Sequence, residues 1–140
     1  GTLREALAFP LLTDRFSDED YVRALQRTGL SRYLNSLDAT QRWDRELSEE
    51  EQMAVALARV VLHAPDWVVF DDTFSALEDE ALERVLGLFT NGLSGTTVIH
   101  IGRSQQANLS LFSRVLHLTR LNGNRGREPE CNAQRIVGNR

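Results

Sequence analysis

The feature that most constrains the fold is a twelve-residue segment at positions 67–78, WVVFDDTFSALE. Its first four residues are apolar, with the aromatic and β-branched side chains typical of a strand buried on both faces of a parallel sheet. Asp71 and Asp72 follow directly, so we expect them at the carboxyl end of that strand, where open α/β sheets bind ligands. A carboxylate there can hold Mg²⁺ directly or through water. An ordinary α/β protein can also end a strand in two acids, so both interpretations stay open.

Helices and further strands are predicted around this segment. A short helix is expected within residues 1–10, ending near Pro10. Further helices are expected at 18–28, from 31, at 49–63 and from about 78, and strands at 96–101 and 114–118. In the helix at 18–28, Val22 and Leu25 are expected to face inward. This order of elements predicts the α/β fold class.

The helix at 49–63 has the clearest signals. Ser48 and Glu51 match a capping box, and Pro65 marks the end before the central strand. Its apolar residues recur at helical spacing, at Met53, Ala56, Leu57, Val60 and Val61. A purely structural amphipathic helix would have the same pattern, so periodicity assigns it no function.

Composition excludes several kinds of site. With 140 residues and 41% hydrophobic content, the chain is predicted to form one globular unit, and no apolar run approaches the roughly 20 residues of a membrane helix. Cys131 is the only cysteine, which excludes an intramolecular disulfide and a cysteine-based zinc site. All sixteen basic residues are arginine, so Schiff-base, phosphate-loop and receiver-domain lysines are all absent from this sequence.

The charge is distributed unevenly. The net charge is −4, and residues 121–140 contribute +2 of it, four arginines against two glutamates, which leaves −6 on residues 1–120. An acidic surface of this kind argues against nonspecific nucleic-acid binding, which depends on basic side chains. Residues 121–140 are rich in Gly, Asn and Arg and are predicted to form a loose tail.

Three segments, taken in order, resemble the second half of the ATP-binding cassette, the ATPase domain of ABC transporters. They are LSEEEQ from residue 47, WVVFDDTFSALE from 67 and TTVIHIGRS from 96. The family pattern is LSGGQ or LSLGEQ, then a helix, then the Walker B strand ending in Asp-Glu, then SALD and a switch histidine. The resemblance covers roughly residues 1–120. It is closest to the branch of peroxisomal acyl-CoA exporters and bacterial peptide or vitamin B12 transporters.

The resemblance implies roles for particular residues, with ATP and Mg²⁺ as cofactors. Asp71 matches the Walker B aspartate that positions Mg²⁺, and Asp72 stands where the family has the glutamate that polarises the attacking water. The residues matching the signature and the SALD motif are Leu47, Ser48, Glu49, Glu50, Glu51, Gln52, Ser75, Ala76, Leu77 and Glu78. In the family the amino end of the signature helix faces the γ-phosphate of ATP bound on the opposite subunit.

Several positions depart from the family pattern. Asp72 is one methylene shorter than glutamate, and misplacement by about 1 Å can cost on the order of 100-fold in rate. Glu50 stands where the family has glycine, and a carboxylate about 5 Å from a phosphate charge would repel it by ~3 kcal/mol at an effective dielectric near 20. The switch histidine falls on Arg103 or is deleted. His100 lies three positions earlier, and an odd offset on a strand places it on the opposite face.

The resemblance divides the chain into a helical subdomain with the signature at 1–64, a distal α/β half with Walker B and the switch strand at 65–120, and the tail. It implies an ATPase domain that drives transport at the cytoplasmic face of the inner membrane, with a membrane-spanning domain and a second nucleotide-binding domain as partners and no nucleic acid. The Walker A loop is lacking here, so this chain alone is predicted to be inactive. The alternative is a degenerate, noncatalytic cassette that acts as a regulatory or structural partner. A receiver-like signalling domain is disfavoured because it needs a lysine.

Overall fold

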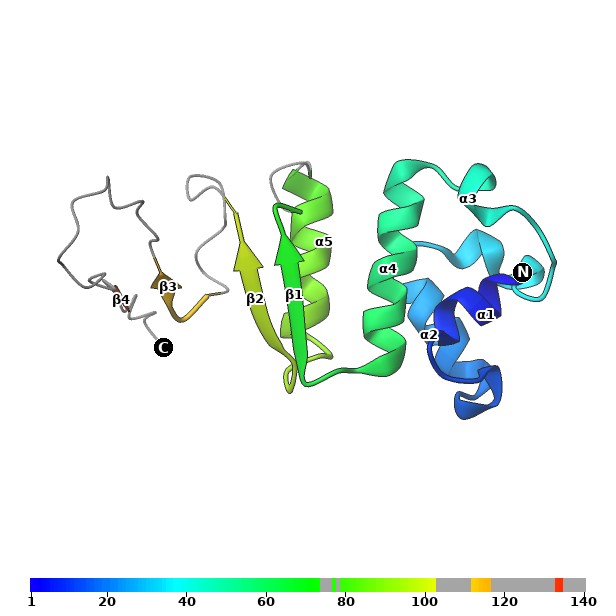
Figure 1. Cartoon of the computed structure of the whole chain (residues 1–140), viewed down its shortest axis with the longest axis horizontal. Helices are drawn as coiled ribbons and strands as arrows, with labels where there is room; N and C mark the ends of the chain where they lie inside the picture. The colour runs from blue at the N-terminus through cyan, green and yellow to red at the C-terminus, as the bar shows by residue number, and fades with distance from the viewer. Residues whose placement is uncertain (74–76, 78, 103–111, 117–132, 135–140) are drawn as a thin grey trace, which may run out of the picture. The chain divides into compact units, whose positions relative to one another are not determined.

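The structure is a computed structural model that describes residues 1–73, 77, 79–102, 112–116 and 133–134 (Figure 1). Its elements are α1 (Leu3–Ala8), η1 (Thr13–Arg15), α2 (Asp18–Arg27), η2 (Ser31–Ser36), α3 (Trp43–Glu46), α4 (Glu49–His63), β1 (Trp67–Asp71), α5 (Asp79–Thr90), β2 (Thr97–Ile101), β3 (Val115–Leu116) and β4 (Ala133–Gln134). The chain forms two compact units, Gly1–Gly102 and Arg103–Arg140, rather than the one unit expected from its length. Within the first unit we call residues 1–63 the helical part and residues 67–102 the sheet part.

Local sequence signals determine where the helices begin and end. α1, α2 and α4 each start at a capping box, with Thr2, Ser17 and Ser48 as the N-cap residues. The hydroxyl oxygen of the N-cap residue accepts a hydrogen bond from the backbone N–H of the third helical residue, and the carboxylate of that third residue accepts one from the backbone N–H of the N-cap residue. Gly29 follows α2 with φ of 80°, the left-handed conformation that ends many helices. The predictions for α1, α2 and α4 are confirmed, whereas the segment from Ser31 is a 3₁₀ helix.

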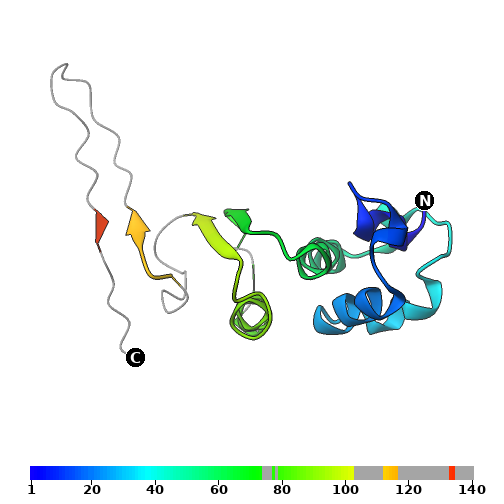
Figure 2. The same ribbon diagram turned by 90° about the horizontal axis from the view of Figure 1, so that it is seen from below.

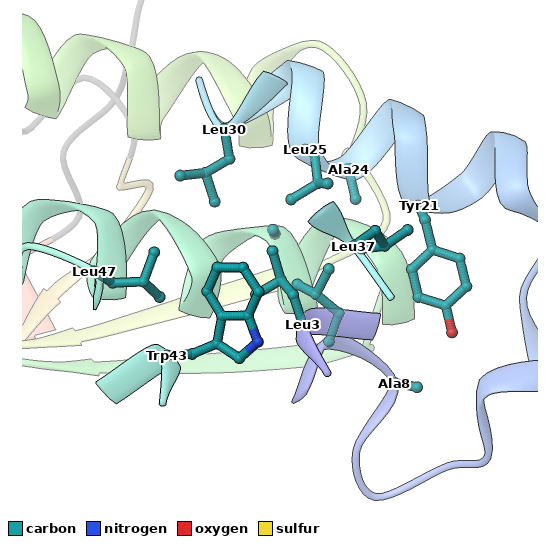
Figure 3. Close-up of a cluster of buried hydrophobic side chains, with 11 residues drawn as sticks. Leu3, Ala8, Tyr21, Ala24, Leu25, Leu30, Leu37, Trp43 and Leu47 are labelled. Atoms are coloured by element: carbon teal, nitrogen blue, oxygen red, sulfur yellow. The ribbon is translucent and has the colours of Figure 1, made fainter. Parts of the chain in front are cut away.

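The helical part contains a hydrophobic core to which each of its α-helices contributes (Figure 3). Its buried residues are Leu3, Leu7, Ala8, Tyr21, Ala24, Leu25, Leu30, Leu37, Trp43, Leu47 and Ala58. Figure 3 shows the Trp43 ring in the middle of this cluster. The side chains converge from segments that are distant in the sequence, so this core fixes the packing of α1 and α2 against α4.

The buried faces of α2 and α4 agree in part with the apolar patterns. α2 buries Leu25 as expected, together with Tyr21 and Ala24, whereas Val22 is only half-buried. In α4, Leu57 is buried and Val61 packs against the core with Ala54, Val55, Ala58 and Leu62, whereas Ala56 is exposed. Residues 53–62 of α4 are apolar at nearly every position, so periodicity could not identify the buried face.

β1 and β2 form a parallel pair in which Phe70 lies beside His100 and Asp71 beside Ile101. The Phe70 ring packs edge-on against Phe89 of α5, with centroids 5.8 Å apart. Figure 2 shows α5 on one side of the two strands. The prediction that the central strand is buried on both faces is wrong for the described residues. Trp67 and Val69 are 63% and 58% exposed, because successive side chains alternate between faces and α5 covers only one.

The second unit is described only in part. β3 and β4 pair antiparallel, with Val115 beside Gln134 and Leu116 beside Ala133. β3 lies within the strand predicted at 114–118, and β4 lies within the segment predicted to be a loose tail. The loop or irregular helix predicted at 104–110 falls outside the described residues. Over the parts of the chain that are described, no helix has both the length and the apolar character needed to cross a bilayer.

Candidate functional site

The amino end of α4 has the geometry that the sequence predicts. Ser48 Oγ accepts a hydrogen bond from the backbone N–H of Glu51 at 3.3 Å, and a Glu51 carboxylate oxygen accepts from the backbone N–H of Ser48 at 3.1 Å. Ser48, Glu49 and Glu50 are exposed. The first turn of a fifteen-residue helix therefore presents its positive dipole end and two exposed carboxylates at the same place.

Glu51 differs from its two neighbours because its charge is compensated within the helical part. Its carboxylate accepts a hydrogen bond from the Tyr33 hydroxyl at 3.0 Å and forms an ion pair with Arg32. Hydrogen bonds from the Ser48 backbone, and then from Tyr33 with the nearby charge of Arg32, lower the pKa of Glu51 below its ordinary value. Sequence reasoning missed Arg32 and Tyr33, since both are too distant in the chain for any spacing rule to pair them with Glu51.

Leu47 and Gln52 anchor the segment that precedes α4. Leu47 is buried in the core of the helical part. The side-chain amide of Gln52 donates to the carbonyl oxygen of Leu47 at 3.1 Å and, at 3.5 Å, to that of Asp44. Gln52 thus fixes the backbone that leads into Ser48.

Asp71 and Asp72 lie at the carboxyl end of β1, as predicted. Asp71 is the last residue of the strand, and Asp72 turns the chain with a φ of 48°. Aspartate tolerates this left-handed conformation better than most residues. The backbone N–H of Asp72 donates to the carbonyl oxygen of Ile101 at 2.7 Å, which holds the turn against the end of β2. Both residues are exposed.

The chemistry of these two carboxylates fits Mg²⁺, which typically takes one or two protein carboxylates together with water and phosphate oxygens. The described residues include no cluster of three or more His, Cys, Asp or Glu side chains able to hold a metal ion.

His100 is not brought to the same face of the sheet as Asp71. It lies beside Phe70, on the face that α5 covers, while Asp71 lies beside Ile101 on the other face. The His100 ring packs over Gly102, where an added Cβ would lie 2.5 Å from the ring carbon Cε1. Position 103 lies outside the described residues, so the offset between His100 and that position stays a prediction.

The remaining predicted residues are placed in part. Ser75, Ala76, Glu78 and Arg103 lie outside the described residues. Leu77 lines a cavity of about 390 Å³, together with Glu50, Glu51 and Met53 of α4 and the inner face of α5.

Comparisons with known proteins give a consistent result. An uncharacterized ABC transporter ATP-binding protein of Haemophilus influenzae is 38% identical over 73% of this chain and 17% of its own length. The inner membrane ABC transporter ATP-binding protein YddA of Escherichia coli is 33% identical over 72% of this chain and 18% of its own. A bacterial Atm1-family ABC exporter with ATP bound shares the fold over 82% of this chain and 20% of its own, with a TM-score of 0.63 at 20% identity. No family model matches.

The fold is an α/β cassette of the P-loop NTPase type, with a helical subdomain and part of a parallel sheet. Its features are the parallel strand pair, the capped helix before that pair and the acidic strand end. The chain belongs to the ATP-binding cassette family of ABC transporter ATP-binding proteins. It spans less than a fifth of the length of these two curated relatives. The narrower resemblance to peroxisomal and vitamin B12 transporters stays a prediction.

Proposed function

We propose that this chain supplies the signature and the Walker B strand end of an ATPase that drives an ABC transporter. The observation that carries the proposal is the joint presence, in family order, of Ser48 capping α4 and Asp71 ending β1 beside β2. In this proposal the partners are a membrane-spanning domain and a second cassette, at the cytoplasmic face of the inner membrane, and no nucleic acid takes part. ATP and Mg²⁺ are the cofactors of the intact cassette.

The proposed roles follow the geometry of the two ends. Asp71 would hold Mg²⁺, whose charge stabilises the phosphate oxygens when ATP is bound. Asp72 would orient the attacking water. Leu47 to Gln52 would present the amino end of α4 to a phosphate on the opposite cassette. The contact between cassettes would be formed by Ser75, Ala76, Leu77 and Glu78. Arg103 would take the switch position.

A second candidate function is a noncatalytic cassette that serves as a regulatory or structural partner. Two observations favour it. Glu49 and Glu50 are exposed at the end of α4 where a phosphate would approach, and Asp72 is shorter than the glutamate of the family pattern. Both features weaken hydrolysis without disturbing the fold, which is what a degenerate partner cassette requires.

Substitutions at Asp72 separate these functions in an intact cassette that carries this chain. If the cassette is catalytic, Asp72→Asn abolishes the steady-state ATPase rate. Asp72→Glu raises it, by up to about 100-fold, because the longer side chain restores the reach of the carboxylate. Asp66→Asn, at an exposed acid just before β1, is the matched control and leaves the rate unchanged. A rate that is the same in all three variants would favour the noncatalytic partner.

A further inference from the structure

Arg27, in the last turn of α2, reaches from the helical part to the sheet part. Its Nη2 donates to the carbonyl oxygen of Leu88 at 3.3 Å, across 61 positions of sequence. Leu88 lies in the last turn of α5, where carbonyl oxygens lack a partner within the helix. A guanidinium is favoured there because the carboxyl end of a helix is the negative end of its dipole.

Gly92 lies against the same guanidinium. A Cβ added at Gly92 would lie 2.6 Å from Cζ of Arg27 and closer still to both of its terminal nitrogens. Gly92 is not in the left-handed region, so its backbone conformation would accept alanine. Because the guanidinium is the end of a flexible side chain, an alanine at position 92 would push it aside and away from the carbonyl oxygen of Leu88.

A cavity lies beside this contact. The cavity of about 390 Å³ that Leu77 lines is bounded by Arg27 of α2, by Met53 and Leu57 of α4, and by Ala81 and Val85 of α5. At this level α4 and α5 are separated by open space, so Arg27 bridges two parts of the unit beside a region that is not closely packed.

We propose that Arg27 and Gly92 form a clamp that fixes the position of α5 relative to α2 and α4. Because α4 carries Ser48 and the sheet part carries Asp71, the clamp makes Arg27 a positioning residue for both ends of the candidate site. This inference goes beyond the proposed function, since both clamp residues lie within this chain and its test needs no nucleotide.

The first test is a double-mutant cycle on the 140-residue chain, read as the midpoint of urea unfolding. Gly92→Ala lowers the midpoint in the wild-type background, because the methyl group displaces the guanidinium. In an Arg27→Ala background, Gly92→Ala does not lower the midpoint. It raises the midpoint there, because alanine has less conformational freedom than glycine in the unfolded chain, if that is the largest remaining effect of the substitution. Equal shifts in both backgrounds would overturn the proposal.

Matched controls separate the clamp from general effects of the substitutions. Gly95→Ala has no atom within 4 Å of the added Cβ and shifts the midpoint equally in both backgrounds. Arg23→Ala removes an exposed arginine from the same helix, and Gly92→Ala is as costly in that background as in the wild type. If Gly92→Ala alone does not fold, the Arg27→Ala/Gly92→Ala variant does, and failure of both contradicts the clamp.

The second test measures the position of α5 relative to α2. Spin labels at the exposed positions Glu19 in α2 and Glu83 in α5, in a Cys131→Ser background, report the distance between the two parts. The clamp predicts a narrow distance distribution that broadens or shifts in Arg27→Ala and in Gly92→Ala, and that is unchanged in Gly95→Ala. A distribution that Arg27→Ala leaves unchanged would show that Arg27 does not position α5.

Discussion

Arg4 holds α1 against two other segments of the helical part. Its guanidinium donates to both carboxylate oxygens of Asp38, at 2.6 and 3.0 Å, and to Asp18 at 2.6 Å. It also lies 4.6 Å from the centroid of the Tyr21 ring. The planar fork of arginine is needed for this arrangement, because a lysine ammonium cannot bond two carboxylates in the same way while it stacks on a ring.

We therefore expect Arg4→Lys to lower the midpoint of chemical unfolding at pH 7, and by more than Arg42→Lys, whose pair with Asp44 is local and exposed. The hydrogen bond from Arg4 lowers the pKa of Asp38, so its contribution is fully present above the unfolded-state pKa near 4 and is lost as the pH falls through the lower folded-state value. The difference between wild type and Arg4→Lys should then shrink below about pH 4. A difference that is constant down to pH 2 would contradict this account.

α4 ends in an unfavourable backbone conformation. Ala64 is its C-cap, with φ of 41° and ψ of 57°, and its N–H still donates to the carbonyl oxygen of Val60. Left-handed backbone costs a residue with a Cβ roughly 1–2 kcal/mol, and glycine is the usual residue at such a helix end. Pro65 follows and prevents the helix from continuing.

Ala64→Gly should therefore stabilise the 140-residue chain, by about 0.5–1 kcal/mol once the greater freedom of glycine in the unfolded chain is subtracted. Ala56→Gly, at an exposed position inside the same helix, is the control and should cost about 1 kcal/mol. The opposite signs of the two changes can be measured by urea unfolding. A loss of stability in both variants would mean that the helix continues in a right-handed conformation through residue 64.

Local signals in the sequence predicted where α2, α4 and β1 begin or end better than they predicted how these elements pack. The capping residues Ser17 and Ser48 placed the starts of α2 and α4, because the hydrogen bonds of a cap are made within four residues. Asp71 was placed correctly for a similar reason, since a short apolar run followed by acids indicates where a strand ends. The apolar residues singled out in α4 divide in the structure, with Leu57 buried and Ala56 exposed, because apolar side chains surround this helix.

Contacts between distant segments were not predictable in this way. Arg32 compensates Glu51, and Arg4 joins Asp18 to Asp38, through tertiary structure that no sequence spacing encodes. The exposed face of β1 was missed because an apolar strand sequence shows only that both faces can be buried, whereas α5 covers one of them among the described residues.

At the scale of the whole molecule, the position of α4 determines where the candidate site lies. The helical part presents Ser48, Glu49 and Glu50 at one exposed helix end, where, among the described residues, Arg32 pairs with Glu51. The dipole that lets these acids stabilise the helix is the same feature that would attract a phosphate. If that end faces ATP on an opposite cassette, Glu50 opposes binding by an amount of the order of 3 kcal/mol at about 5 Å.

The most direct measurement is ATP-dependent dimerisation of an intact cassette that carries this chain, with and without Glu50→Gly, followed by sedimentation together with the ATPase rate. Glycine should cost α4 up to about 1 kcal/mol of stability, and Ala56→Gly gives a matched loss of helix propensity elsewhere in α4. The account predicts that Glu50→Gly tightens the ATP-dependent dimer while Ala56→Gly does not. If neither dimer affinity nor ATPase rate changes in Glu50→Gly, this carboxylate does not face the phosphate, and the assignment of α4 as the signature helix is contradicted.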